Sequence, residues 1–191
     1  TLLAVYHLAS RECPLSKLAG ISPILDAAGV ASLPQARMAI IDGIKLSPSH
    51  ARNFEGQDVN TLWGELGMQL LGPEGYAMVA DADRDGTSPG KGVLTELLQK
   101  AQPCVILVDE LVAYVRQFES GKAYKGGTYD SNMSFIQGLT EAMKSVPQAI
   151  LLASLPESDI EVGGAQGQRA LEALEKFFGR LEAVWKPVAS E

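Results

Sequence analysis

Uninterrupted apolar runs recur along this chain and predict its strands. Residues 104–108 and 149–153 are each five consecutive apolar residues, and a shorter run at 37–42 is closed by Gly43. Apolar runs without polar alternation are typical of strands buried on both faces, as in parallel sheets. We therefore expect three central strands at these positions.

Helical periodicity fills the intervals between the runs. We expect helices at 2–9, 60–71, 93–101, 110–119, between Asp130 and Pro147, and at about 167–181. The fifth of these places its apolar residues at spacings of three or four, and Asp130 or Ser131 is its expected N-cap. Segments rich in Gly, Pro, Asp, Asn and Ser, at 43–59 and 72–92, are expected to be loops. Strands alternating with helices predict an α/β fold with a mainly parallel sheet.

Composition narrows the class of protein. The 191 residues suit one domain, and a net charge of −7 argues against direct nucleic-acid binding by this segment. No apolar run approaches the roughly 18 residues that a membrane span needs. Only two cysteines and two histidines occur, too few for a convincing zinc site. We expect a soluble, cytoplasmic protein without membrane contact.

Both ends of the sequence carry core-like patterns. The chain opens directly on the helical pattern after Thr1, and strand-like residues 183–185 lie close to its end. Domain boundaries usually fall in exposed linkers. We therefore expect residues 1–191 to be a single, partial domain of a longer polypeptide.

The acidic pair Asp109-Glu110, directly after the run 104–108, is the principal candidate for chemistry. Ligands of open parallel sheets bind outside the carboxyl ends of the strands. There Asp109 could hold Mg²⁺, which prefers oxygen ligands, and Glu110 could polarise a water molecule that attacks a phosphate. The alternative is a strand that merely ends in two solvated acids.

Two further residues fit a phosphate site at the same edge. Ser154 follows the run 149–153, and its hydroxyl would then lie near the acidic pair; equally, it could simply begin the turn completed by Pro156. Arg180 ends the last predicted helix. Its guanidinium could reach the nucleotide of a neighbouring subunit, or it could only complement the helix dipole.

Two stretches imitate known motifs incompletely. The stretch 86–92 resembles the phosphate-binding pattern G-x-x-x-x-G-K followed by Ser or Thr, but it is one residue short and ends in Gly92. Asp81, Asp83 and Asp85 open like a calcium-binding loop, yet the closing glutamate position is also Gly92. We reject the first and keep calcium binding only as a weak alternative.

Three segments, 103–114, 149–157 and 178–188, resemble a family of bacterial and archaeal AAA-like ATPases, some of which belong to phage-exclusion (BREX/Pgl-type) defence loci near DNA methyltransferases. The resemblance implies a three-layer α/β/α P-loop NTPase-like core that uses ATP and Mg²⁺. It makes Asp109 and Glu110 the Walker B pair, with Asp109 on the metal, Ser154 the sensor-1 residue and Arg180 an arginine finger. Thr1 would lie just behind an upstream Walker A loop, and the helical lid would lie beyond residue 191.

Two functions remain to be weighed. The first is the core of an ATPase that assembles with copies of itself, in a larger complex or with a DNA-modifying partner, the present segment being inactive alone. The alternative is a degenerate P-loop fold that serves as a non-catalytic interaction scaffold.

Overall fold

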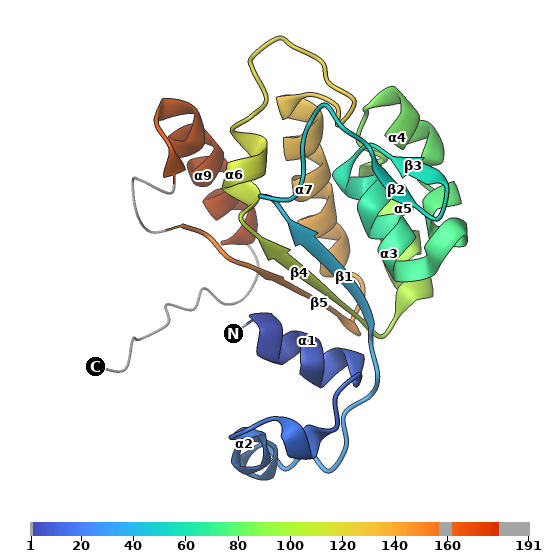
Figure 1. Ribbon diagram of the computed structural model, residues 1–191, viewed down its shortest axis with the longest axis vertical. Coiled ribbons are helices and arrows are strands. Elements are labelled where there is room, and N and C mark those ends of the chain that lie inside the picture. Colours follow the sequence, from blue (N-terminus) through green and yellow to red (C-terminus); the bar gives the residue numbers. More distant parts are fainter. Residues whose placement is uncertain (1, 157–161, 180–191) are drawn as a thin grey trace.

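A parallel sheet forms the centre of the computed structural model, which describes residues 2–156 and 162–179. Its strands are β1 (Arg37–Asp42), β4 (Cys104–Asp109) and β5 (Ala149–Ala153), in the order β1-β4-β5 (Figure 1). All neighbours are parallel. The predicted strands and the α/β class with a mainly parallel sheet are confirmed.

Helices and one antiparallel hairpin complete the described part of the chain. The hairpin pairs β2 (Arg52–Phe54) with β3 (Gln57–Val59). The helices are α1 (Leu2–Ser10), the 3-10 helix η1 (Leu15–Lys17), α2 (Ile21–Ala27), α3 (Leu62–Ala77), α4 (Ala80–Asp85), α5 (Gly90–Ala101), α6 (Leu111–Val115), α7 (Tyr129–Met143) and α9 (Ala165–Phe178). None of the helices among these residues is long and apolar enough to cross a membrane.

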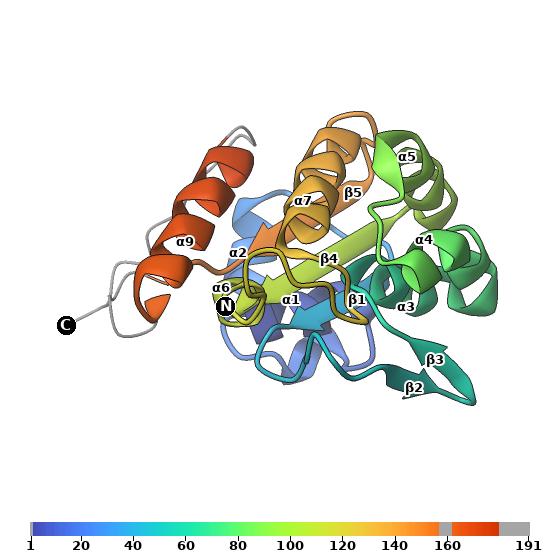
Figure 2. The same cartoon turned by 90° about the horizontal axis from the view of Figure 1, so that it is seen from above.

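The two faces of the sheet are covered by different helices. Ile41, Ile106 and Val108 belong to the main hydrophobic core, which α5 and α7 complete. Val105 and Leu107, one residue out of phase, are also buried but lie outside that core, on the face contacted by α1. Figure 2 shows α1 on one side of the sheet and α5 and α7 on the other. Burial on both faces explains why β4 reads as an unbroken apolar run.

Residues 72–92 are largely helical, so the expected loop is wrong. Helix α3 continues past a kink at Gly72 (φ 63°), because Pro73 can begin a new helical turn but cannot continue the old one. Helix α4 then occupies the region of the three spaced aspartates, and α5 begins at Gly90. Glycine and proline here mark joints between short helices instead of a loop.

Three smaller expectations also need correction. The N-cap of α7 is Thr128, which accepts from the Ser131 amide while the Ser131 hydroxyl accepts from the Thr128 amide. The expected caps, Asp130 and Ser131, are therefore inside the helix. The helix expected over 110–119 ends at Val115, and the 43–59 loop contains the β2–β3 hairpin.

Candidate functional site

Polar residues from three strands meet at the carboxyl edge of the sheet. The parallel register sets Asp42 of β1 beside Asp109 of β4, and Val108 beside Ala153 of β5. Ser154, the next residue after β5, therefore lies level with Asp109. The register thus brings together Asp109, Glu110 and Ser154, the predicted site residues among those that the structure describes.

Ser154 connects both acidic residues of the site. Its hydroxyl donates a hydrogen bond to Oδ1 of Asp109. The same Oγ accepts from the backbone N–H of Glu110 at 3.4 Å, and the Ser154 amide donates to the Val108 carbonyl at 2.9 Å. The hydroxyl therefore orients the Asp109 carboxylate and supports the backbone of the next residue. Turn formation alone does not account for these contacts.

Glu110 holds a backbone conformation that is unusual for a residue with a side chain. Its φ of 54° and ψ of 34° are left-handed, at a cost of about 1–2 kcal/mol. Such conformations persist only where the surroundings impose them, and they occur often at functional sites. The turn ends β4 sharply and starts α6, so the acidic side chain is set at the sheet edge.

Gly43 explains how that turn is accommodated. Its amide donates to the Asp109 carbonyl at 2.9 Å. A Cβ atom added to Gly43 would lie 2.0 Å from the carbonyl oxygen of Glu110, closer than any real contact. Only glycine fits beside the turn, and the backbone after β1 thus holds the backbone of the acidic pair.

Asp42 adds a third carboxylate to this edge. Its Oδ1 accepts from the Ile44 amide at 3.2 Å, and its Oδ2 pairs with Lys45 Nζ at 3.1 Å. The lysine side chain is 80% exposed, so this ion pair contributes little to the stability of the fold. Sequence reasoning missed Asp42, although its place at the end of a predicted parallel strand, just before Gly43, was a usable signal.

The donor set of this edge fits a magnesium ion that is shared with a phosphate. Within the described ranges no three His, Cys, Asp or Glu side chains are grouped to hold a metal by themselves. Magnesium is usually bound by one or two carboxylates, with water and substrate phosphate oxygens filling the other positions. A single oriented carboxylate, Asp109, beside the hydroxyl of Ser154 suits that mode of binding.

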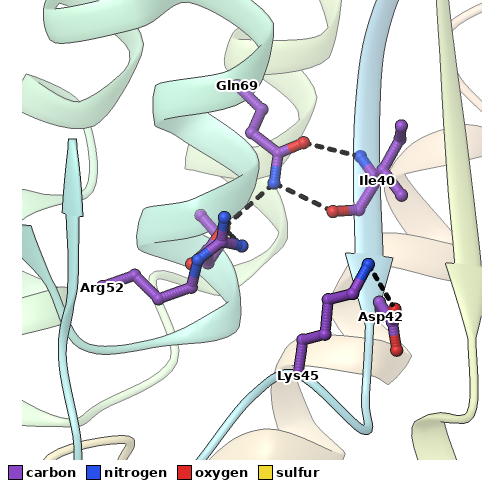
Figure 3. A network of polar contacts seen from close by, with 6 residues as sticks. Ile40, Asp42, Lys45, Arg52 and Gln69 are labelled. Carbon is purple, nitrogen blue, oxygen red and sulfur yellow. Dashed lines mark hydrogen bonds and ion pairs between the residues drawn. The ribbon is translucent and has the colours of Figure 1, made fainter.

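A second polar group closes the outer edge of β1 (Figure 3). The side chain of Gln69 accepts from the Ile40 amide at 2.7 Å and donates to the Ile40 carbonyl at 2.9 Å. It also donates to Glu65, which pairs with Arg52 at 2.9 Å. Burial raises the pKa of Glu65, opposed by its bonds to Gln69 and Arg52. A hollow of about 310 Å³ adjoins this group, lined by Ile40, Asp42, Lys45, Arg52, Phe54 and Gln69.

The spaced aspartates do not form a calcium loop. They lie on helix α4, where Asp83 is fully buried and accepts from the Thr61 amide at 2.9 Å and from the Thr61 hydroxyl at 2.6 Å. The Tyr76 hydroxyl donates to the same carboxylate at 3.0 Å. Asp81 is exposed and pairs with Arg84. Asp83 therefore anchors the start of α3, and its two neighbours face elsewhere.

Two predicted site residues, Thr1 and Arg180, lie outside the described residues. The nearest described elements are α1, which begins at Leu2, and α9, which ends at Phe178.

One protein-family model matches residues 1–187 and is described as the DUF499 N-terminal domain. That description names no activity. No curated protein and no solved structure matches the chain.

Proposed function

We propose that this chain, which belongs to the DUF499 N-terminal domain family, forms the hydrolytic half of a P-loop-type ATPase core. One observation supports this most strongly: Asp109, Glu110 and Ser154 converge at the carboxyl edge of a parallel sheet. This is the edge at which open α/β sheets bind ligands. An oriented carboxylate, a second acid and a hydroxyl are the groups that phosphate hydrolysis with magnesium requires.

Each residue has a distinct role in this proposal. Asp109, held by the Ser154 hydroxyl, would bind the Mg²⁺ of MgATP. Glu110 would accept a proton from the attacking water, and Ser154 would sense the phosphate through its link to both acids. The left-handed turn at Glu110, supported by Gly43, would keep the general base fixed relative to the metal-binding carboxylate. Bound Mg²⁺ would supply charge neutralisation on the phosphate oxygens.

In this proposal the remaining parts of the machinery would come from residues before and after this segment and from neighbouring copies. The phosphate-cradling loop would precede Thr1, and Arg180 would reach the nucleotide of an adjacent subunit. ATP turnover would then drive a larger assembly, such as one that acts with a DNA-modifying partner in phage defence. These assignments rest on the resemblance to AAA-like ATPases.

Steady-state ATP hydrolysis by the full-length protein tests the proposal. Glu110→Gln is expected to lower kcat by about 10²–10⁴, the usual contribution of a general base. Glu96→Gln is the matched control, because Glu96 lies on α5, its side chain is 61% exposed, and it pairs with the exposed Lys100. We expect its rate to be unchanged.

Two results would overturn the proposal. Equal rates for the wild type and Glu110→Gln would remove Glu110 from catalysis. Undetectable turnover by the wild-type full-length protein would favour the non-catalytic scaffold.

A further inference from the structure

The hollow beside β1 has a size and a chemistry that suit a small organic ligand. Its volume of about 310 Å³ lies within the range of about 300–1,000 Å³ that is usual for ligand pockets. Figure 3 shows Arg52 entering from the hairpin and Lys45 from the loop after β1. The wall combines two apolar side chains, one amide, one carboxylate and two cations, namely Ile40 and Phe54, Gln69, Asp42, and Lys45 and Arg52.

Arg52 is held in place by two neighbours. Its Nη1 donates to Oε2 of Glu65 at 2.9 Å, and its guanidinium carbon lies over the Phe54 ring, 5.1 Å from the ring centroid. Residues two apart on a strand lie on the same face, so β2 itself places Arg52 beside Phe54. Because Glu65 occupies Nη1, the other edge of the guanidinium, Nε and Nη2, offers two parallel donors. This edge matches the two oxygens of a carboxylate.

Glu65 holds Arg52 in a way that stability does not explain. The Glu65 side chain is 4% exposed, and its Oε1 is buried without a hydrogen-bond partner among the described residues. A buried carboxylate disfavours folding unless its partners satisfy it fully. The ion pair recovers little of this cost, because the Arg52 side chain is 46% exposed. A buried residue that orients a half-exposed cation is a typical support of a binding site.

The charges around the hollow favour a ligand with a single negative charge. Asp42, which pairs with Lys45 at 3.1 Å, already places a carboxylate in the wall. A polyphosphate would bring several negative charges close to Asp42 and would be repelled. A monocarboxylate can bind Arg52 while its organic body packs on Phe54 and on Ile40, which is 41% exposed. Apolar contacts with a few fixed polar groups are the usual composition of a small-molecule site.

We propose that this hollow binds a small organic monocarboxylate. Arg52 binds the carboxylate through Nε and Nη2, and Phe54 and Ile40 contact the apolar body. Lys45 adds a second donor from the loop after β1. The site needs neither ATP nor Mg²⁺, and it stands whether or not the proposed ATPase function holds.

Saturation-transfer NMR on the full-length protein tests the class of ligand. Benzoate is the probe, benzamide is its uncharged counterpart of nearly the same shape, and inorganic phosphate is an anion without an apolar body. We expect saturable benzoate binding that is at least about tenfold tighter than that of benzamide, because the amide loses the charge-assisted bond. Equimolar phosphate should leave benzoate bound. Absence of saturable benzoate binding, equal binding of benzamide, or displacement by equimolar phosphate would each overturn the proposal.

Two arginine-to-lysine variants locate the bound probe. Arg52→Lys keeps a cation beside Glu65 but removes the paired donors, so we expect benzoate binding to weaken at least about fivefold. Arg84→Lys is the matched control, because Arg84 is exposed on α4 and pairs with Asp81 and Asp85. We expect it to bind benzoate as the wild type does.

Lys45→Gln gives a second measurement that does not depend on the Glu65 ion pair. Lys45 is exposed, so its substitution leaves the fold intact, and benzoate binding should weaken about twofold to threefold. Unchanged benzoate binding by both Arg52→Lys and Lys45→Gln would place the probe elsewhere and overturn the proposal. Because none of these measurements uses ATP, the carboxylate site and the ATPase proposal are tested separately.

Discussion

Replacing Gly43 by alanine should destabilise the fold and damage the site together. The added Cβ would lie 2.0 Å from the Glu110 carbonyl oxygen and 2.6 Å from its carbon. Ordinary contact begins near 3.4 Å, so the two backbones must separate by about 1.4 Å. No side-chain rotation can relieve a contact with backbone atoms. The strain must therefore pass into the left-handed turn at Glu110.

The expected cost lies at the upper end of the range for overpacking. Inserting a methyl group into a well-packed site typically costs 1–3 kcal/mol, so we expect about 3 kcal/mol for Gly43→Ala. For a domain of this size, that corresponds to a fall in Tm of about 6–12 °C. In the full-length protein kcat for ATP should also fall, since Glu110 moves relative to Asp109.

Thermal unfolding of Gly43→Ala alongside Gly92→Ala provides the test. Gly92 lies in α5 with open space around its Cβ position, and alanine there should add about 0.5–1 kcal/mol through helix propensity. Both substitutions replace glycine by alanine, but the first is expected to lower the free energy of unfolding and the second to raise it. A Gly43→Ala protein as stable as the wild type would refute the close approach on which this reasoning depends.

Three other substitutions probe the supporting structure. Asp83→Ala should lower the free energy of unfolding by about 3 kcal/mol in urea denaturation, because buried donors lose their acceptor, whereas exposed Asp81→Ala should have little effect. Glu65→Gln should gain stability relative to the wild type as pH rises from 4.5 towards 7. The pKa of Glu65 is raised in the folded wild type, so the folded protein binds a proton at Glu65 more tightly than the unfolded chain does. The stability of the wild type therefore falls as this proton is lost with rising pH. Parallel pH profiles of the two proteins would contradict the shift. Gln69→Ala should cost about 1–2 kcal/mol and speed amide exchange at Ile40, and unchanged exchange there would show that the β1 edge is closed by something else.

The strands and the core of the site were predictable from sequence because both follow from local patterns. An unbroken apolar run such as 104–108 has few structural interpretations, and parallel strands place their carboxyl ends together. Asp109 and Ser154 could therefore be expected to meet although 45 residues separate them. The direct bond between them confirms their proximity and leaves their chemistry a proposal.

Other features depend on tertiary contacts that no local pattern reveals. Gly43 looks like an ordinary strand-ending glycine until the Glu110 carbonyl is found against it. Gln69 looks like a solvent-facing helix residue, yet its side-chain amide bonds to the N–H and C=O of Ile40, as the backbone of a neighbouring strand would. In 72–92, glycine and proline density suggested a loop. The region instead forms short helices, which pack against the core by burying Val79 and Asp83.

A single-turnover measurement on the full-length protein separates ATP binding from the catalytic step assigned to Glu110. Wild-type and Glu110→Gln proteins are mixed with less than one equivalent of radiolabelled ATP and excess Mg²⁺, and bound ATP and ADP are followed over time. We expect both proteins to bind ATP, the wild type to convert it to ADP, and Glu110→Gln to retain it at least about 100-fold longer. Conversion at the same rate in both proteins would contradict the assignment of Glu110, and with it the proposed site at the carboxyl edge of the sheet.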